Sequence, residues 1–216
     1  MQLLQRWYDS NRLDYDVYNE HLYLVDAWVS WRVYSRMQIY QMTRRINEIK
    51  KIVNIDGIDT IVDLGGGIGY STLALKELFN PSRVYTTQIE GTDQYKICEF
   101  IFKNIDNAEV IPNVSKLDNA DIVFASEYFE HFTHPIHHLN EIIKLNPKII
   151  IVANSFGVDD AIGHFTEYYD LNNVPHKGKK ISRIFNDRLR EAGYDNKQIR
   201  FYNNLPAFFV RKDCIL

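Results

Sequence analysis

The sequence predicts an α/β fold: a doubly wound, mostly parallel seven-stranded sheet with helices on both faces. Three observations lead to this fold class. Strand-like and helix-like segments alternate from residue 60 onward, and such alternation produces parallel strands joined by right-handed crossovers. The first strand runs directly into a glycine-rich turn and the start of a helix. The last two strand-like segments flank Asn203-Asn204-Leu205-Pro206, a turn that would make them an antiparallel C-terminal hairpin.

The expected strands are short runs in which apolar, β-branched and aromatic residues predominate. They span residues 60–64, 83–89, 108–112, 120–126, 148–153, 198–202 and 207–212. The run at 148–153 is apolar almost throughout, as expected of a parallel strand that is buried on both faces.

The expected helices lie between these strands, at residues 71–79, 92–103, 135–145 and 181–192. Pro135 stands in the first turn of the third helix, and Gly193 follows the last one, which are favoured positions for these residues. Residues 154–180 are expected to form a long loop or lid with a short helix around 159–169.

The predicted organisation is an N-terminal helical extension or cap at residues 1–56 and a sheet domain at 57–216. Between Asn19 and Lys51 apolar residues recur at three- and four-residue steps, which predicts one amphipathic helix or two in line. The extension holds Trp7, Trp28 and Trp31 together with many tyrosines. These aromatic residues could cover a pocket, pack on the sheet or form the face of a homodimer.

The composition is that of an ordinary globular protein, with 45% hydrophobic and 25% charged residues. The net charge of −3 disfavours a surface adapted as a whole to nucleic acid. Cys98 and Cys214 lack metal-ligand spacing, and the N-terminus lacks the apolar core of a signal peptide. No apolar run has the length of a membrane span, so we expect a cytoplasmic protein.

The first strand leads into Asp63-Leu64-Gly65-Gly66-Gly67-Ile68-Gly69, a turn with almost no side chains. A strand, such a turn and a helix N-terminus together are how α/β proteins hold nucleotides. The spacing is G-x-G-x-G, whereas the dinucleotide fingerprint is G-x-G-x-x-G, so a nicotinamide dehydrogenase is disfavoured.

The shorter glycine pattern, with an acid two residues before its first glycine, resembles motif I of the class I S-adenosylmethionine-dependent methyltransferases. Three later stretches resemble the same family in order. They are the fourth strand with its following Glu130-His131 pair, the Leu145-Asn146-Pro147 turn before strand five, and Ala192-Gly193-Tyr194 at the end of the last helix. The resemblance covers about residues 58–212 and implies S-adenosylmethionine as cofactor.

The resemblance also implies which residues contact the cofactor. They are Asp63, Gly65, Gly66, Gly67 and Gly69 in the loop, Gln88, Ile89 or Glu90 at the end of strand two, Asn113 after strand three, and Ser126 and Glu127 after strand four.

Two of these positions depart from the family pattern. An acid normally ends strand two and holds both ribose hydroxyls, but here that position is Gln88, which offers one oxygen and two donors. Glu90 would lie on the same face if the strand continued, so Glu90 is the favoured ribose ligand and Gln88 is the alternative. After strand three, Asn113 could pair with the adenine edge or simply serve the turn.

Methyl transfer is an in-line displacement in which the protein aligns the nucleophile and a base receives its proton. His131 is the first candidate for that base because it follows strand four, where a parallel sheet places its ligands. His164 is the alternative base, and Glu130 stands at the same edge of the sheet. His131, His134, His137 and His138 suggest a metal, but no acid or cysteine at ligand spacing completes them, so no metal site is predicted.

The sequence therefore predicts a methyltransferase that acts on an oxygen or nitrogen of a small-molecule acceptor, such as a sugar, nucleotide or other metabolite. A non-catalytic binding or scaffold protein is the alternative, because Gln88 replaces the acid. A nucleic-acid methyltransferase is a further alternative. Against it, the sequence lacks an Asn/Asp-Pro-Pro-aromatic tetrad, a Pro-Cys nucleophile and an overall basic charge.

Overall fold

The computed structural model describes residues 2–14, 16–17, 20, 47, 51, 56–158, 160–197 and 207–215. The helix expected at residues 19–51 lies almost entirely outside the described residues, as does the strand expected at 198–202.

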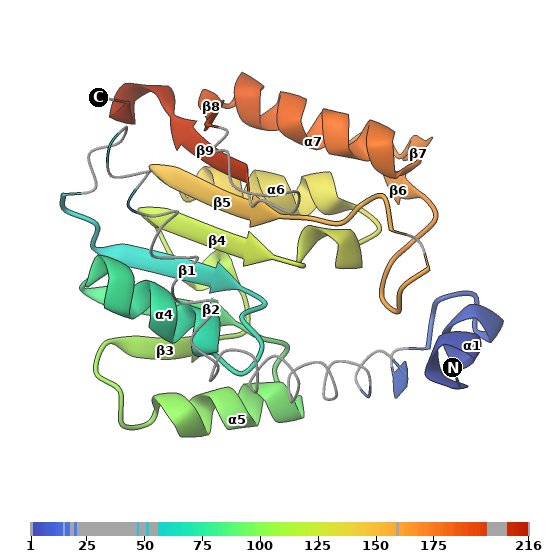
Figure 1. The fold of residues 1–216 in the computed structure, drawn as a ribbon, viewed down its shortest axis with the longest axis horizontal. Coiled ribbons are helices and arrows are strands. Elements are labelled where there is room, and N and C mark those ends of the chain that lie inside the picture. Colours follow the sequence, from blue (N-terminus) through green and yellow to red (C-terminus); the bar gives the residue numbers. More distant parts are fainter. Residues whose placement is uncertain are drawn as a thin grey trace.

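The centre of the protein is one seven-stranded sheet with the order β3-β2-β1-β4-β5-β9-β8 (Figure 1). Its strands are β1 (Thr60–Leu64), β2 (Arg83–Thr87), β3 (Ala108–Ile111), β4 (Ile122–Ser126), β5 (Ile149–Ala153), β8 (Tyr194–Lys197) and β9 (Ala207–Arg211). The first five are parallel, whereas β9 pairs antiparallel with both β5 and β8. The predicted fold class is thus confirmed, and the strand order reverses between β1 and β4.

Helices cover both faces of the sheet because successive strand residues point to opposite sides. The α-helices of the described residues are α1 (Gln2–Asp9), α4 (Tyr70–Phe79), α5 (Asp93–Phe102), α6 (Pro135–Lys144) and α7 (Gly178–Glu191). The apolar side chains of α6 and α7 form one core with Val62, Val123 and Ile150 of the sheet. On the opposite face, the alternate residues Ile61 and Ile122 pack with α4.

Strand two ends at Thr87, two residues earlier than expected. The chain turns there because the Ile89 carbonyl accepts hydrogen bonds from the backbone N–H and the hydroxyl of Thr92, and Gly91 has a positive φ of 85°. Thr92 then caps α5 by accepting a hydrogen bond from the Tyr95 backbone N–H.

Strand β8 begins directly after Gly193, at Tyr194, where no strand was expected. One further expectation needs correction. The short helix expected around 159–169 is absent from the described residues 160–169. Gly163 interrupts that stretch with a φ of 82°, and its end, β6 (Tyr168–Tyr169), pairs with β7 (Pro175–His176) in a small hairpin.

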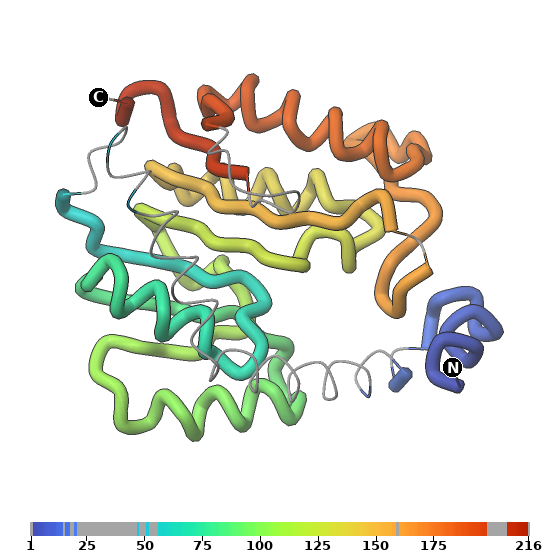
Figure 2. The backbone as a smooth tube through the Cα atoms, viewed as in Figure 1, coloured from blue at the N-terminus to red at the C-terminus, as the bar shows by residue number. Residues whose placement is uncertain are grey.

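Helix α1 lies beside the long loop that follows β5, as the backbone trace shows (Figure 2). Trp7 of α1 is buried and packs with Val17 against Ile162, and its ring centroid is 6.3 Å from that of Phe165. Part of the N-terminal extension is therefore joined to the sheet domain through this loop. Among the helices of the described segments, none is both long and apolar enough to cross a membrane.

Candidate functional site

The glycine loop lies close to the neighbouring strands at the carboxyl end of β1. A Cβ atom on Gly66 would come within 2.5 Å of both Asp63 Oδ2 and Thr86 Oγ1, so no larger residue fits there. Gly65 has a φ of 61°, and its backbone N–H donates to Thr87 Oγ1 at 3.0 Å. The loop is thereby fastened to β2, with its backbone open to the space above the sheet.

Asp63 connects the end of β1 to the first turn of α4. Its Oδ2 accepts hydrogen bonds from Ser71 Oγ at 2.6 Å and from Thr72 Oγ1 at 2.7 Å. Burial raises the pKa of Asp63 to about 6, although both hydroxyl groups act in the opposite direction. The buried carboxyl group orders the turn on which the glycine loop stands.

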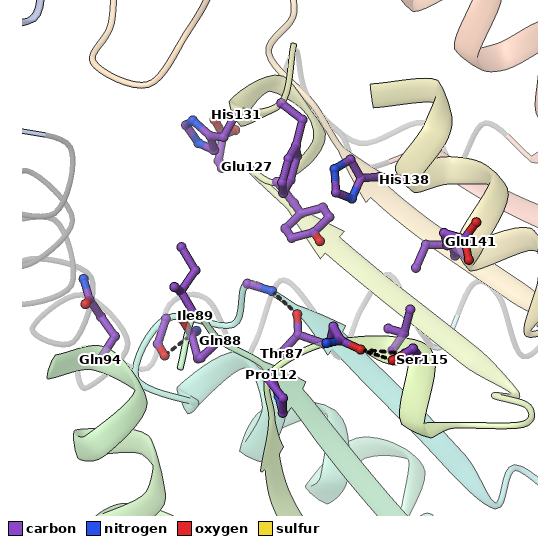
Figure 3. A pocket seen from close by; sticks show the side chains of 17 residues that line it. Thr87, Gln88, Ile89, Gln94, Pro112, Ser115, Glu127, His131, His138 and Glu141 are labelled. Atoms are coloured by element: carbon purple, nitrogen blue, oxygen red, sulfur yellow. Dashed lines mark hydrogen bonds between the residues drawn. The ribbon is translucent and has the colours of Figure 1, made fainter. Parts of the chain in front are cut away.

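A cavity of about 550 Å³ opens above the carboxyl ends of β1, β2, β3 and β4 (Figure 3). This volume is in the range of small-molecule sites, and the cavity lies where the strand order reverses. Its walls are formed by Gly65, Gly67, Thr87, Gln88, Ile89, Gln94, Pro112, Asn113, Val114, Ser115, Glu127, Tyr128, His131, Phe132, His138, Glu141 and Ile142.

The structure divides the predicted site residues into two groups. Those that line the cavity are Gly65, Gly67, Gln88, Ile89, Asn113, Glu127 and His131. Those that do not line it are Asp63, Gly66, Gly69, Glu90, Ser126, Glu130 and His164. Of this second group, Glu130 and His164 are buried beside Glu127, directly behind the cavity wall.

Gln88 uses its amide group on the glycine loop, because its Nε2 donates to the Gly67 carbonyl oxygen at 2.6 Å. A carboxylate could not donate this bond, which gives a physical reason for glutamine at this position. Glu90 follows the end of β2 and is exposed. Because β2 does not continue to Glu90, this residue does not share a strand face with Gln88. Of the two alternatives, only Gln88 reaches the cavity.

Asn113 lines the cavity and also serves the turn after β3. Its Oδ1 accepts a hydrogen bond from the Ser115 backbone N–H at 3.0 Å, which leaves its amide NH₂ available to a ligand.

Sequence reasoning missed Tyr128 and Gln94. The Tyr128 ring packs between Phe132, at 4.9 Å, and Phe129, and burial raises the pKa of its hydroxyl to about 12. Tyr128 lines the cavity and follows Glu127, whose φ is positive at 51°. No sequence pattern predicts this backbone conformation.

Gln94 is buried, and its Nε2 has no hydrogen-bond partner among the described residues. The Thr92 cap could have indicated Gln94 as a site residue, because the cap places Gln94 in the first turn of α5.

Behind the wall lies a cluster of two acids and two histidines. Glu130 is fully buried, and its Oε1 accepts a hydrogen bond from the Ser155 backbone N–H at 2.8 Å. Burial raises the pKa of Glu130, and the nearby carboxyl group of Glu127 raises it further. The rings of His131 and His164 meet edge to face with centroids 5.0 Å apart.

The histidines of the 131–138 segment do not converge on one point. His134 stacks on Tyr169 with centroids 5.0 Å apart, whereas His138 lies against Phe132, where burial lowers its pKa. The only group of metal-ligating side chains at suitable distances in the described ranges is Glu127, Glu130 and His164.

Solved structures similar to this chain have the same fold. One chain of the complex between the Haloferax volcanii Trm112 methyltransferase activator and a methyltransferase matches with a TM-score of 0.54 at 15% identity, over 86% of this chain and 96% of that one. The magnesium protoporphyrin IX methyltransferase of Synechocystis PCC 6803, solved with bound SAH, matches with a TM-score of 0.53 at 16% identity, over 83% and 84%. The YcgJ protein of Bacillus subtilis matches with a TM-score of 0.54 at 11% identity, over 76% and 71%.

No protein-family model matches the sequence, and no curated protein matches it. The resemblance that the sequence motifs indicated is confirmed at the level of the fold, which this chain shares with methyltransferases of low sequence identity.

Proposed function

We propose that this protein is an S-adenosylmethionine-dependent methyltransferase that acts on an oxygen or nitrogen of a small-molecule acceptor, such as a sugar, nucleotide or other metabolite. The observation that carries the proposal is the position of one cavity. It lies above a glycine loop of motif I spacing, in a fold shared with a methyltransferase solved with SAH, and a histidine and an acid stand on its far wall.

The residues around the cavity fit this cofactor. Gly65 and Gly67 present backbone without side chains, which allows a close approach of the ligand. Gln94 lines the cavity, and its buried Nε2 has no partner among the described residues. The amide of Gln88 donates through Nε2 to the glycine loop, so its oxygen can accept from a ribose hydroxyl. Buried polar groups without partners are costly, so Gln94 is suited to a ligand that accepts a hydrogen bond.

The cofactor supplies a methyl group on a sulfonium ion, which is a good leaving group. The chain aligns the acceptor and receives its proton. His131 lines the cavity, and its Nδ1 lies 3.0 Å from the Gly163 carbonyl oxygen. If Nδ1 carries the ring proton and donates it to that carbonyl, Nε2 has the lone pair that accepts a proton from the acceptor.

Calorimetric titration tests the cofactor. We expect heat of binding with S-adenosylmethionine and none with NAD. Gly67→Asp should abolish the binding because it adds a charged side chain to the loop. Gly57→Asp is the control, because Gly57 has a positive φ of 69° similar to the 60° of Gly67, so the backbone strain is matched. Gly57 precedes the opposite end of β1, and a Cβ there meets nothing within 4 Å. Tight binding of NAD without a response to S-adenosylmethionine would end this proposal.

A screen with labelled methyl donor over metabolite extracts and over nucleic acids tests the acceptor. We expect labelled small molecules, and His131→Ala should slow their formation by ~10² to 10⁴-fold, the usual contribution of a general base. Labelled nucleic acid with no labelled metabolite would contradict the acceptor class. Binding of the cofactor without turnover in either pool would support the scaffold alternative instead.

A further inference from the structure

We propose that Glu127, Glu130 and His164 bind a divalent cation at the edge of the cavity. This inference rests on the proposed function and deepens it, because the cation would meet the methyl acceptor. One oxygen of each carboxylate and one ring nitrogen of His164 lie within 4.8 Å of one another. The three residues come from two loops, after β4 and after β5, that the fold brings to the same edge of the sheet.

The spacing of these three atoms suits a bound cation. Ligands on opposite sides of an ion that is coordinated at about 2.2 Å lie about 4.4 Å apart, and adjacent ligands lie closer. Side-chain rotations would therefore have to bring the three atoms somewhat closer together before they could coordinate one ion.

Glu130 gives independent evidence for a ligand. Its side chain is fully buried, and its Oε2 has no hydrogen-bond partner within the described part of the chain. A buried carboxylate oxygen without a partner is costly, and a second acid beside it increases the cost. A cation between Glu127 and Glu130 would satisfy this oxygen and remove the repulsion between the two acids.

Hydrogen bonds from surrounding groups restrain all three proposed ligands. Ser155 donates its backbone N–H to Glu130 Oε1 and its hydroxyl to Glu127 Oε1, at 2.8 and 3.1 Å. His164 Nδ1 lies 2.8 Å from the Val158 carbonyl oxygen, so a proton on Nδ1 leaves Nε2 with a lone pair. Metal-binding histidines commonly donate their second nitrogen to a backbone carbonyl in this way.

The ligand types indicate which cations fit. Two carboxylates suit Mg²⁺ and Mn²⁺, whereas an imidazole favours the transition metals, so a Mn²⁺-like ion matches the mixed set best. Glu127 and His131 line the cavity, so an ion at this site would face the acceptor. There it would lower the pKa of an acceptor hydroxyl, whose proton passes to His131 as the new O–CH₃ bond forms and the S–CH₃ bond breaks.

The test is calorimetric titration of the full chain with MnCl₂, without methyl donor or acceptor. We expect one Mn²⁺ per chain. Glu130→Gln and His164→Asn should each weaken Mn²⁺ binding by at least about tenfold. The controls are Glu167→Gln, an exposed acid in the same loop as His164, and His137→Asn, an exposed histidine on α6, which should leave the affinity unchanged.

Thermal melting of each variant establishes that it is folded. A folded wild-type chain that binds no Mn²⁺, or one whose affinity is unaffected by Glu130→Gln and His164→Asn, would overturn the proposed site. If the chain bound Mg²⁺ more strongly than Mn²⁺, and His164→Asn left the Mg²⁺ affinity unchanged, His164 would not be a ligand of the ion. Mn²⁺ binding without S-adenosylmethionine binding would refute the proposed function and leave this site standing; the reverse result would refute only the site.

Discussion

Asp63 ends β1 with a buried carboxyl group, and this burial makes the stability of the fold depend on pH. Burial raises the pKa of Asp63 from 3.8 to about 6, so the folded chain holds this proton more tightly than the unfolded chain. The contribution of Asp63 is therefore fully present below about pH 4 and is lost as the pH rises through about 6. The loss over this window is at most about 3 kcal/mol, at about 1.4 kcal/mol for each pKa unit.

Asp63→Asn removes this titration and keeps an oxygen for the hydroxyl groups of Ser71 and Thr72. The free energy of unfolding of the wild type, relative to that of the variant, should fall between about pH 4 and about pH 7. Urea unfolding of both proteins at several pH values measures it. A difference between the two that does not change with pH would mean that Asp63 has an ordinary pKa in the folded chain.

The sequence favoured Glu90 over Gln88 as the ribose ligand, whereas only Gln88 lines the cavity. Gln88→Ala removes the hydrogen bond to the Gly67 carbonyl and the oxygen offered to the ligand. Because one such bond contributes about 1 kcal/mol, we expect three- to tenfold weaker binding of S-adenosylmethionine by calorimetry. Glu90→Ala should change the affinity little, since Glu90 lies outside the cavity. If Glu90→Ala weakened the binding of S-adenosylmethionine more than Gln88→Ala, Glu90 would be the ribose ligand.

Single residues were predicted well where backbone geometry restricts the residue type, and less well where packing decides. The glycine loop follows from its spacing because few other residues fit a turn in which a Cβ would lie 2.5 Å from Asp63. The role of Tyr128 depends on how its ring packs against Phe132 and His138, and the sequence does not show this packing. The contact of Glu130 with His164 depends likewise on the path of the loop that follows β5.

Helix α7 begins at Gly178, three residues before the predicted start, and the contact at that glycine explains its position. A Cβ on Gly178 would lie 1.9 Å from the Phe156 carbonyl oxygen, so the helix start rests directly on the chain that leaves β5. Sequence patterns mark a helix by its apolar spacing, here Ile181, Phe185 and Leu189, and these residues begin only one turn later.

Gly178→Ala should lower the free energy of unfolding by about 1 to 3 kcal/mol, because either α7 or the Phe156 backbone must move. Gly157→Ala is the matched control, since a Cβ there meets nothing within 4 Å and the change should be close to neutral. Chemical denaturation of both variants provides the comparison. Equal stability of the two would mean that this contact is easily relaxed.

At the scale of the whole molecule, the order of strands and helices could be predicted from the sequence because the pattern repeats along the chain. Five parallel strands and the crossovers between them follow from alternation alone. The loop after β5 could not be predicted, because its course depends on a contact with a distant segment. Helix α1 packs Trp7 against Ile162 and Phe165, and Arg12 Nη1 donates to the His164 carbonyl oxygen at 2.5 Å.

This contact predicts that the N-terminal segment stabilises the loop that carries His164. Trp7→Ala removes an indole that is only 2% exposed, so the backbone amides of residues 160–166 should exchange faster with deuterium, while those of β1 and β4 keep their protection. Leu13→Ala is the control, because Leu13 belongs to the same segment and is 64% exposed. Faster exchange throughout the sheet would show instead that Trp7 stabilises the whole fold. If His164 binds a cation, Trp7→Ala should also weaken Mn²⁺ binding, because a ligand on a loosened loop must be ordered again before it can coordinate.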